Sequence, residues 1–413
     1  MNNKIFIQIA SYRDPELLNT IRDCLANAEN PERLVFSIAW QHNKADTWDS
    51  LDEFKNDSRF KIIDIDYKDA KGCCWARNLL QQQYDGEQYT LQLDSHHRFI
   101  KKWDTEIIAM YEGLRKDGVK KPLITGYIPP YSTKNDTRGE VPYKMNFDRF
   151  TPEGVVFFLP ATIDNYKELT KPIQARFYSA HFAFASGQFV KEVPHDPNYN
   201  FHGEEISIGV RAFTWGYDLF HSHKIIAWHE YTREGRVRFW DDDKQWSERD
   251  RASHLRNRKL FEMDGSKKDI NFGIYDFGKV RSLEDYERYA GLSFKKRAVQ
   301  KYTLDNKLAP NPALYGQEYE DTFLKIFKHC IDVHISQFKE RDYKFIAVIF
   351  EGENGQLNRK DLEPKEIKQL FAQKKDFVNI WREFLTEEKP TQWVVWPYSN
   401  TTDYWAEKIT GKL

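Results

Sequence analysis

The chain has 413 residues, 40% of them hydrophobic and 30% charged, a composition typical of a folded globular protein with a sizeable core. Its 62 basic and 63 acidic side chains nearly cancel, whereas proteins that bind duplex DNA usually carry a basic excess. A nucleic-acid partner is therefore disfavoured, although a local basic patch stays open. No apolar run reaches the length of a transmembrane helix, so no membrane span is expected.

The cysteines argue for a reducing compartment. There are four of them, Cys24, Cys73, Cys74 and Cys330. The adjacent pair is poorly placed for a disulfide, and no CxxC spacing of the kind that binds zinc occurs. No hydrophobic signal segment precedes the first strand-like run, which begins at Ile5. Together these features predict a cytoplasmic protein.

The first hundred residues alternate predicted strands and helices. Apolar runs predict strands at residues 4–10, 33–40, 60–65 and 89–93, and helical spacing predicts helices at 17–28 and 76–84. This alternation predicts an α/β fold with a mostly parallel, doubly wound sheet. Ligands of such sheets bind at the carboxyl ends of the strands. Polar clusters follow two of these ends, at residues 11–14 and 94–97, and they share one crevice if their strands are neighbours.

The middle of the chain is less regular. Strand-like runs occur at residues 155–159 and 176–185, and a helix is expected at 206–214. The segment 230–258 is dense in charge and tryptophan, and we interpret it as a mobile loop that leads into a helix.

The composition changes at about residue 309, where a Pro-rich stretch begins. After this point we expect helices and strands in alternation: helices at 323–330 and 365–385, and strands at 344–350 and 392–396. The sequence thus predicts a main domain over residues 1–300 and a small α/β or β-rich accessory module over 310–413, whose role the sequence leaves open.

A carboxylate and an imidazole follow the fourth predicted strand, at Asp94 and His96. In extended chain, side chains two residues apart face the same way, so both reach one cation. A mixed oxygen and nitrogen ligand set suits Mn²⁺ better than Mg²⁺, which prefers oxygen ligands and retained waters. Such an ion neutralises the charge that develops on a departing diphosphate. Hydrolysis by a metal-bound water is an alternative, although the carboxylate cluster of a two-metal site is missing.

Six segments resemble the polypeptide N-acetylglucosaminyltransferases that modify hydroxyproline, a GT-A-fold family related to the polypeptide GalNAc-transferases. The segments occur in family order between residues 4 and 260: they are residues 9–17, 74–78, 92–99, 184–187, 202–206 and 228–233. The resemblance implies a GT-A fold, a UDP-sugar donor, a divalent metal and retention of anomeric configuration.

Carried over position by position, the resemblance assigns Asp94, His96 and His229 to the metal. It makes Glu204 the first candidate for holding the donor sugar and Glu205 the second. The competing interpretation of this pair is that two glutamates in the first turn of a helix simply complement the helix dipole.

Further residues are predicted to bind the nucleotide. Arginine forks suit phosphate oxygens, so Arg13 and Arg77 are candidates for the diphosphate or the base, with a surface salt bridge as the alternative. We also count Arg77 with the catalytic residues. Ser11 and Tyr12 lie in the polar cluster after the first strand, where Tyr12 is placed to stack on uracil.

The charged segment after residue 230 adds three arginines, Arg233, Arg236 and Arg238. A mobile loop here is able to close over the diphosphate and exclude water, and Arg233 is the member that we assign to the donor. For the other two, a solvated charged loop is the alternative.

Taken together, these features predict a metal-dependent, retaining transferase that moves a sugar, GlcNAc in the first instance, from a UDP-sugar to an acceptor hydroxyl on a protein. No nucleophile is evident, and front-face attack requires no protein base. The alternatives are an acceptor that is a glycan, a lipid-linked saccharide or a modified nucleobase, or a non-catalytic relative that only binds sugar.

Overall fold

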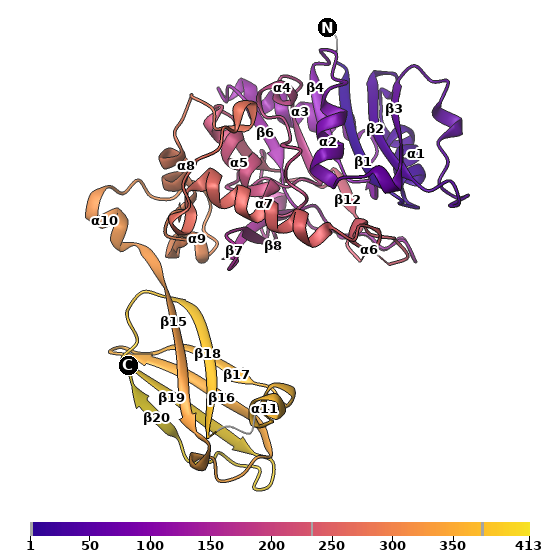
Figure 1. Cartoon of the computed structure of the whole chain (residues 1–413). Helices are drawn as coiled ribbons and strands as arrows, with labels where there is room; N and C mark the ends of the chain where they lie inside the picture. The colour runs from indigo at the N-terminus through magenta and orange to yellow at the C-terminus, as the bar shows by residue number, and fades with distance from the viewer. Residues whose placement is uncertain (1–2, 233, 373–375) are drawn as a thin grey trace. The chain divides into compact units, whose positions relative to one another are not determined.

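The computed structural model describes residues 3–232, 234–372 and 376–413. The chain divides into two compact units, one made of Met1–Arg297 with Tyr302–Leu314, the other of Ala298–Lys301 with Tyr315–Leu413 (Figure 1). In the described part of the chain, no helix has the length and apolar character needed to cross a membrane. The four cysteines are free thiols.

The first unit is built on an eight-stranded sheet with the order β3-β2-β1-β4-β10-β6-β11-β9. Its strands are β1 Ile5–Tyr12, β2 Leu34–His42, β3 Phe60–Asp66, β4 Tyr89–Leu93, β6 Pro122–Thr125, β9 Ile173–Gln174, β10 Phe182–Ser186 and β11 Asp218–His221. Strands β3, β2, β1 and β4 run parallel, whereas β10 is antiparallel to both of its neighbours. The predicted α/β class, with a mostly parallel sheet flanked by helices, is confirmed.

Helices cover this sheet and bury its apolar side chains. The unit contains α1 Leu17–Asn27, α2 Cys73–Gln81, α3 Trp103–Lys116, α4 Phe189–Glu192, α5 Glu204–Thr214, α6 Phe239–Asp242, α7 Trp246–Phe261 and α8 Leu283–Ala290. In the sequence, α9 Lys301–Leu304 lies at a boundary between the two units. In α1, Leu17, Ile21 and Cys24 recur at helical spacing and are fully buried against the sheet. Each such aliphatic side chain stabilises the fold by about 1.5–3 kcal/mol.

Two short paired segments stand beside the main sheet. Strand β5 His97–Phe99 pairs antiparallel with β12 Ala227–His229, and β7 Tyr143–Phe150 pairs antiparallel with β8 Val156–Thr162. A two-residue strand, β13 Leu292–Ser293, follows α8. Because β1 and β4 are adjacent and parallel, the polar clusters that follow them do meet at one edge of the sheet, as the sequence predicted.

The second unit is rich in β-structure. It contains β14 Ala298–Gln300, α10 Gly316–Asp321, β15 Phe323–His334, β16 Tyr343–Gly352, β17 Gly355–Leu362, α11 Pro364–Phe371, β18 Phe377–Thr386, β19 Gln392–Ser399 and β20 Ile409–Lys412. Strands β15 and β18 form an antiparallel ladder (Figure 1), and a second sheet has the order β17-β16-β19-β20. Its core packs aliphatic and aromatic side chains from both sheets and from α11.

Three element predictions are wrong or only partly right. The predicted helix 323–330 is the strand β15, and the predicted helix 365–385 ends at Phe371 and is followed by the strand β18. The apolar positions of both segments fit helical spacing, but their cross-strand contacts, such as Phe327 opposite Phe384, are long-range and override it. The run 176–185 becomes a strand only at Phe182.

Candidate functional site

The chain brings three candidate metal ligands together through the β5–β12 pair. Asp94 directly follows β4, and His96 directly precedes β5. In the antiparallel register His97 lies opposite His229, so β12 places His229 beside the segment that carries the other two side chains. The backbone N–H of Glu230 donates to the carbonyl of His96 at 3.2 Å and extends this pairing.

Their ligand atoms face one another. His229 Nε2 lies 3.3 Å from Asp94 Oδ2, and His96 Nε2 lies 3.8 Å from the same oxygen. One ligand atom from each of the three residues falls within 4.8 Å of the others. Ligands bound about 2.1 Å from a common ion are separated by about 3–4 Å, so the distances from both imidazoles to Asp94 are those expected of ligands that share one divalent cation.

The protonation states also suit a cation. Burial would raise the pKa of Asp94, but its hydrogen bond with His229 and the nearby Arg77 charge keep that pKa well below its usual range. Burial lowers the pKa of His229 well below its usual range, which favours the neutral imidazole that binds metals. His96 Nδ1 lies 2.7 Å from Asp14 Oδ2, so this carboxylate orients the ring with Nε2 toward Asp94.

Arg77 joins the metal candidates to the sugar-binding candidate. Its guanidinium is buried, with Nη2 2.7 Å from Asp94 Oδ1 and Nη1 2.6 Å from Glu204 Oε1. It projects from α2, one turn after the helix begins at Cys73. The surface salt bridge considered as an alternative is not what the structure shows: Arg77 forms a fork between two carboxylates inside the protein.

Glu204 is held as a carboxylate. Burial would raise its pKa, but the charge of Arg77 and the close contact of His195, whose Nδ1 lies 2.9 Å from Oε1, lower that pKa to about 2. Both contacts engage Oε1, which leaves Oε2 directed toward the thiol of Cys73. The glutamate therefore does more than complement the helix dipole at the start of α5.

Glu205, the next residue, is in a different environment. It accepts hydrogen bonds from the backbone N–H of Ala180 at 2.9 Å and from the hydroxyl of Tyr127 at 3.4 Å. Burial raises its pKa to about 7. One of two adjacent glutamates is thus ionised at neutral pH, while the other is close to half-protonated.

The raised pKa of Glu205 predicts a pH-dependent stability. Because the folded state holds this proton more tightly than the unfolded state, the contribution is fully present below about pH 4.5 and is lost as the pH rises through 7. Wild type should therefore lose about 2 kcal/mol of unfolding free energy relative to Glu205→Gln between pH 5 and pH 8. Urea unfolding at both pH values measures this difference. An equal gap between the two proteins at pH 5 and pH 8 would contradict the assignment.

Gly203 precedes Glu204 and Glu205 because the turn before α5 needs a left-handed backbone conformation. Its φ of 90° lies in the left-handed region, and a Cβ there would come within 2.9 Å of the Tyr199 ring. The glycine thus allows the tight entry into α5 against its neighbours.

Two cavities meet at the metal candidates. The smaller, of about 230 Å³, is lined by residues from the ends of β1 and β4, from the segment before α6 and from α6 itself, including Tyr12, Asp14, Ser95, Arg236, Phe239 and Trp240. The larger, of about 390 Å³, is lined by β8 and the start of α5, including Val155, Phe157, Phe158, His181, Glu204 and Glu205. Arg77, Asp94 and His229 line both. A group bound at the trio is thus reached from two sides.

The predicted nucleotide-binding residues fall into different places. Tyr12 lines the smaller cavity, with its ring 5.6 Å from that of Phe239. Arg13 is paired with Asp46 at 2.8 Å and with Asp242 at 2.9 Å. Ser11 is fully buried and is not among the residues that line this cavity. Arg233 lies outside the residues that the structure describes.

The segment after residue 230 is partly folded inward. The Arg236 guanidinium is nearly buried, 2.7 Å from Glu230 and 3.3 Å from Asp14, and it also contacts His96. Arg238 instead pairs with Asp241 at the surface. The sequence placed Arg236 in a mobile loop, and its spacing carried no signal for this contact with the candidate metal ligands.

Two further residues at the site were not assigned from the sequence. Asp14 lies in the polar cluster after the first strand, and only its contact with His96 reveals its role. The His181 ring stacks on that of His229 with centroids 4.3 Å apart. Since His181 comes from the loop before β10, its proximity is a property of the fold.

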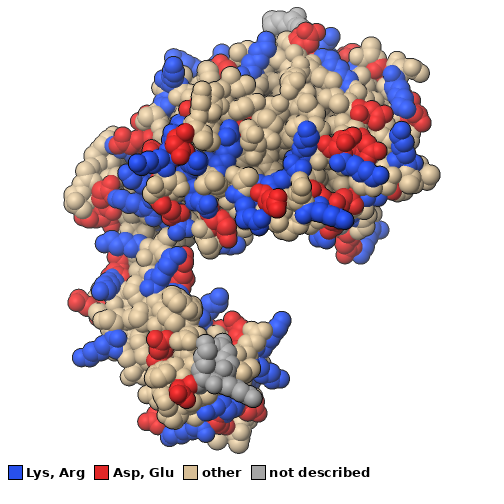
Figure 2. Space-filling model, in the orientation of Figure 1, with Lys and Arg blue, Asp and Glu red and all other residues tan. Residues whose placement is uncertain are grey.

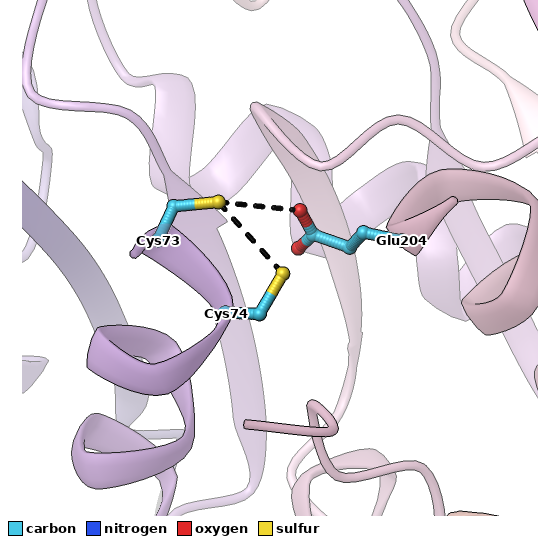
Figure 3. Close-up of side chains that lie close together, drawn as sticks. All are labelled: Cys73, Cys74 and Glu204. Carbon is cyan, nitrogen blue, oxygen red and sulfur yellow. Dashed lines mark hydrogen bonds between the residues drawn. The ribbon is translucent and has the colours of Figure 1, made fainter. Parts of the chain in front are cut away.

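Cys73 and Cys74 begin α2 beside Glu204 (Figure 3). Figure 3 shows both thiols pointing toward the carboxylate, with Cys73 Sγ 3.6 Å from Glu204 Oε2 and 3.8 Å from Cys74 Sγ. Cys74 is fully buried, whereas Cys73 is only partly buried and lines the smaller cavity. Burial raises the pKa of the Cys74 thiol well above its usual range, and a protonated thiol is a poor metal ligand, so a cation is less favoured here than at the trio of Asp94.

Alkylation of Cys73 is therefore expected to inhibit the sugar transfer that the sequence predicts, because the added group enters the cavity beside Glu204. We expect iodoacetamide to abolish this predicted activity, the predicted UDP-sugar donor to slow the inactivation, and Cys73→Ser to be resistant. Cys330→Ser, which removes the partly exposed thiol of the second unit, is the matched control and should stay sensitive. Equal inactivation of Cys73→Ser and wild type would contradict this placement.

Comparison with known proteins identifies a family. The family model of glycosyltransferases (GlcNAc) matches residues 4–58 and 49–296. No sequence among the curated proteins is significantly similar to the chain. Similar solved structures include GalNAc-T7 with UDP, GalNAc and Mn²⁺, at 13% identity and a TM-score of 0.46, covering 69% of this chain and 54% of that one. This chain thus spans about half the length of that structure.

Structures of TarS from S. aureus are also similar. One TarS structure, at 10% identity and a TM-score of 0.39, aligns over 99% of this chain and 77% of its own. TarS 1–349 in complex with UDP-GlcNAc aligns at 13% identity and a TM-score of 0.35, over 62% of this chain and 73% of its own.

Proposed function

Because the chain belongs to the family of GlcNAc glycosyltransferases, we propose that it transfers GlcNAc from UDP-GlcNAc to an acceptor hydroxyl, with a divalent cation at Asp94, His96 and His229. That the chain is a glycosyltransferase rests on the family. The observation that supports the finer proposal is the position of the three ligand atoms, within 4.8 Å of one another at the junction of two cavities.

The ligand set favours Mn²⁺ over Mg²⁺, since two of the three ligands are imidazole nitrogens. When bound, the ion would neutralise the two charges that develop on the departing UDP. Asp14 keeps His96 oriented for this role, and Arg77 keeps Asp94 ionised and fixed. The hydrolase alternative has no support from a bridging carboxylate within the described trio.

We place the nucleotide in the smaller cavity and the acceptor in the larger. Tyr12 and Phe239 offer aromatic faces for the base in the smaller cavity, and Arg236 offers a positive charge near the diphosphate. Glu204 lines the larger cavity beside Arg77, and its Oε2 makes no contact with Arg77, so this oxygen suits a hydrogen bond from a sugar hydroxyl. This hydrogen bond would hold the anomeric carbon toward the larger cavity.

A protein hydroxyl is the acceptor that we favour. Valine, phenylalanine and proline side chains of β8 and the residue before it make the larger cavity apolar on one wall, which suits a side chain such as hydroxyproline on a peptide. Figure 2 shows basic and acidic side chains interspersed over the visible face of each unit, and the net charge is −1. Neither feature favours a nucleic-acid acceptor.

We propose that the anomeric configuration is retained by front-face attack, in which the departing phosphate takes the acceptor's proton. Inversion is the second candidate, because Glu205 lines the larger cavity with a pKa near 7 and is suited to act as a base there. The anomeric configuration of the product, read by NMR, separates the two. A glycosyl adduct trapped on a carboxylate of the chain would contradict front-face attack.

A donor panel tests the proposed function. The full chain with Mn²⁺ is incubated with UDP-GlcNAc, UDP-GalNAc, UDP-glucose and UDP-galactose, and release of UDP is measured. We expect the fastest release from UDP-GlcNAc, followed by transfer to hydroxyproline peptides in an acceptor screen that also contains glycans, lipid-linked saccharides and modified nucleosides. Binding without release of UDP from any donor would identify a non-catalytic sugar-binding protein instead.

A further inference from the structure

A second cluster of metal-binding side chains lies on α7. Asp250 and His254 are four residues apart on this helix and so share one face. His202 approaches them from the turn before α5, with Nδ1 3.0 Å from Asp250 Oδ1. His254 Nε2 lies 3.7 Å from Asp250 Oδ2. One ligand atom from each residue lies within 4.8 Å of the other two.

The two imidazoles of this cluster are arranged to share a ligand. The rings of His202 and His254 stand nearly parallel, 16° apart, with centroids 5.6 Å from each other and Asp250 between them.

We propose that His202, Asp250 and His254 form a second metal site, distinct from the one at Asp94, that binds Zn²⁺. Two imidazoles and one carboxylate are a ligand set that Zn²⁺ accepts in tetrahedral geometry, with water in the fourth position. The cluster has no lysine or arginine among its salt-bridge partners in the described residues. Arg258, one turn further along α7, points away from the cluster and donates a hydrogen bond to the backbone carbonyl of Glu153.

The site would stabilise the turn that carries the sugar-binding candidate. The same face of α7 already makes two hydrogen bonds with this turn. Ser253 accepts from the N–H of Asn200 at 2.7 Å, and Asn257 accepts from the Tyr199 hydroxyl at 3.4 Å. His202 directly precedes Gly203 and Glu204 along the chain. A bound Zn²⁺ ion would thus add a third interaction between α7 and the start of α5.

Zinc titration of the full chain tests this proposal independently of sugar transfer. The background is Asp94→Ala with Cys73→Ser, which takes one ligand from each of the other two groups of candidate ligands among the described residues. After removal of metals, we expect one Zn²⁺ per chain by calorimetry, with an affinity that falls at least roughly tenfold in His254→Gln. The matched control is His329→Gln, a partly buried histidine of β15, which should leave the affinity unchanged.

Thermal unfolding gives a second readout. Binding to the folded state raises the melting temperature, so Zn²⁺ should stabilise the background protein and its His329→Gln variant but not His254→Gln. Asp250→Asn, which keeps the size of the side chain, should behave like His254→Gln. A background protein that binds no Zn²⁺, or equal affinities with and without His254 and the carboxylate of Asp250, would overturn the proposal.

Discussion

Replacement of Arg77 by alanine is expected to abolish sugar transfer and to lower the free energy of unfolding by about 3–5 kcal/mol, the usual effect of removing one partner from a buried ion pair. Two carboxylates, Asp94 and Glu204, would lose the charge between them in a region largely removed from water. Denaturant unfolding and release of UDP, measured on the same preparation, give both effects.

The control is Arg77→Lys. A single ammonium cannot donate to two carboxylates in the planar fork of a guanidinium, so this variant should recover much of the stability but little of the activity. A second control is Arg98→Ala. Arg98 makes a comparable contact with Glu16 at 2.5 Å but takes no part in the fork between the two carboxylates, so this variant should stay active. Wild-type turnover in Arg77→Ala would show that Asp94 and Glu204 need no such support.

The second large effect is expected at the metal candidates. Asp94→Ala and His96→Ala should each reduce turnover by about 100- to 1,000-fold or more, the scale seen when transition-state charge loses its stabilisation. The fold should remain intact in both variants. Arg77 stays paired with Glu204 in Asp94→Ala, and Asp14 keeps its hydrogen bond with Ser95 in His96→Ala. Turnover is followed by release of UDP, and folding by circular dichroism.

A histidine outside the cluster provides the matched control. His223 is buried, and its ring nitrogens are absent from the trio at Asp94, so His223→Gln should retain activity. Retained activity in both Asp94→Ala and His96→Ala would remove the metal role from these residues. Loss of activity together with loss of the circular-dichroism signal would mean that these side chains maintain the fold and would argue against a purely chemical role.

The first half of the fold was predictable because its signals are local. The strands around Ile7 and Leu91 are short apolar runs between polar loops, and their parallel pairing follows from the helices between them. In the second unit, Phe327 and Phe384 have helical spacing with their own neighbours but are held in strands by each other. Such long-range pairing leaves no trace within a local window.

The candidate site shows the same division between residues that local sequence patterns identify and residues that only the fold brings together. Asp94 and His96 were found because they are close in sequence and follow a strand, and the resemblance added His229 from far along the chain. Asp14 and Arg236 contact this group through the folding of separate loops, which no spacing reports. Arg77 was identified, but its position between two carboxylates depends on the packing of α2 against the start of α5.

We propose that UDP leaves with the help of a cation held by Asp94, His96 and His229. The most direct test is the initial rate of UDP release from UDP-GlcNAc by the chelator-treated full chain during a titration with Mn²⁺. We predict almost no release without metal, a saturable increase on addition of Mn²⁺, and no increase in Asp94→Ala. Release that proceeds at the same rate after chelation would contradict the claim.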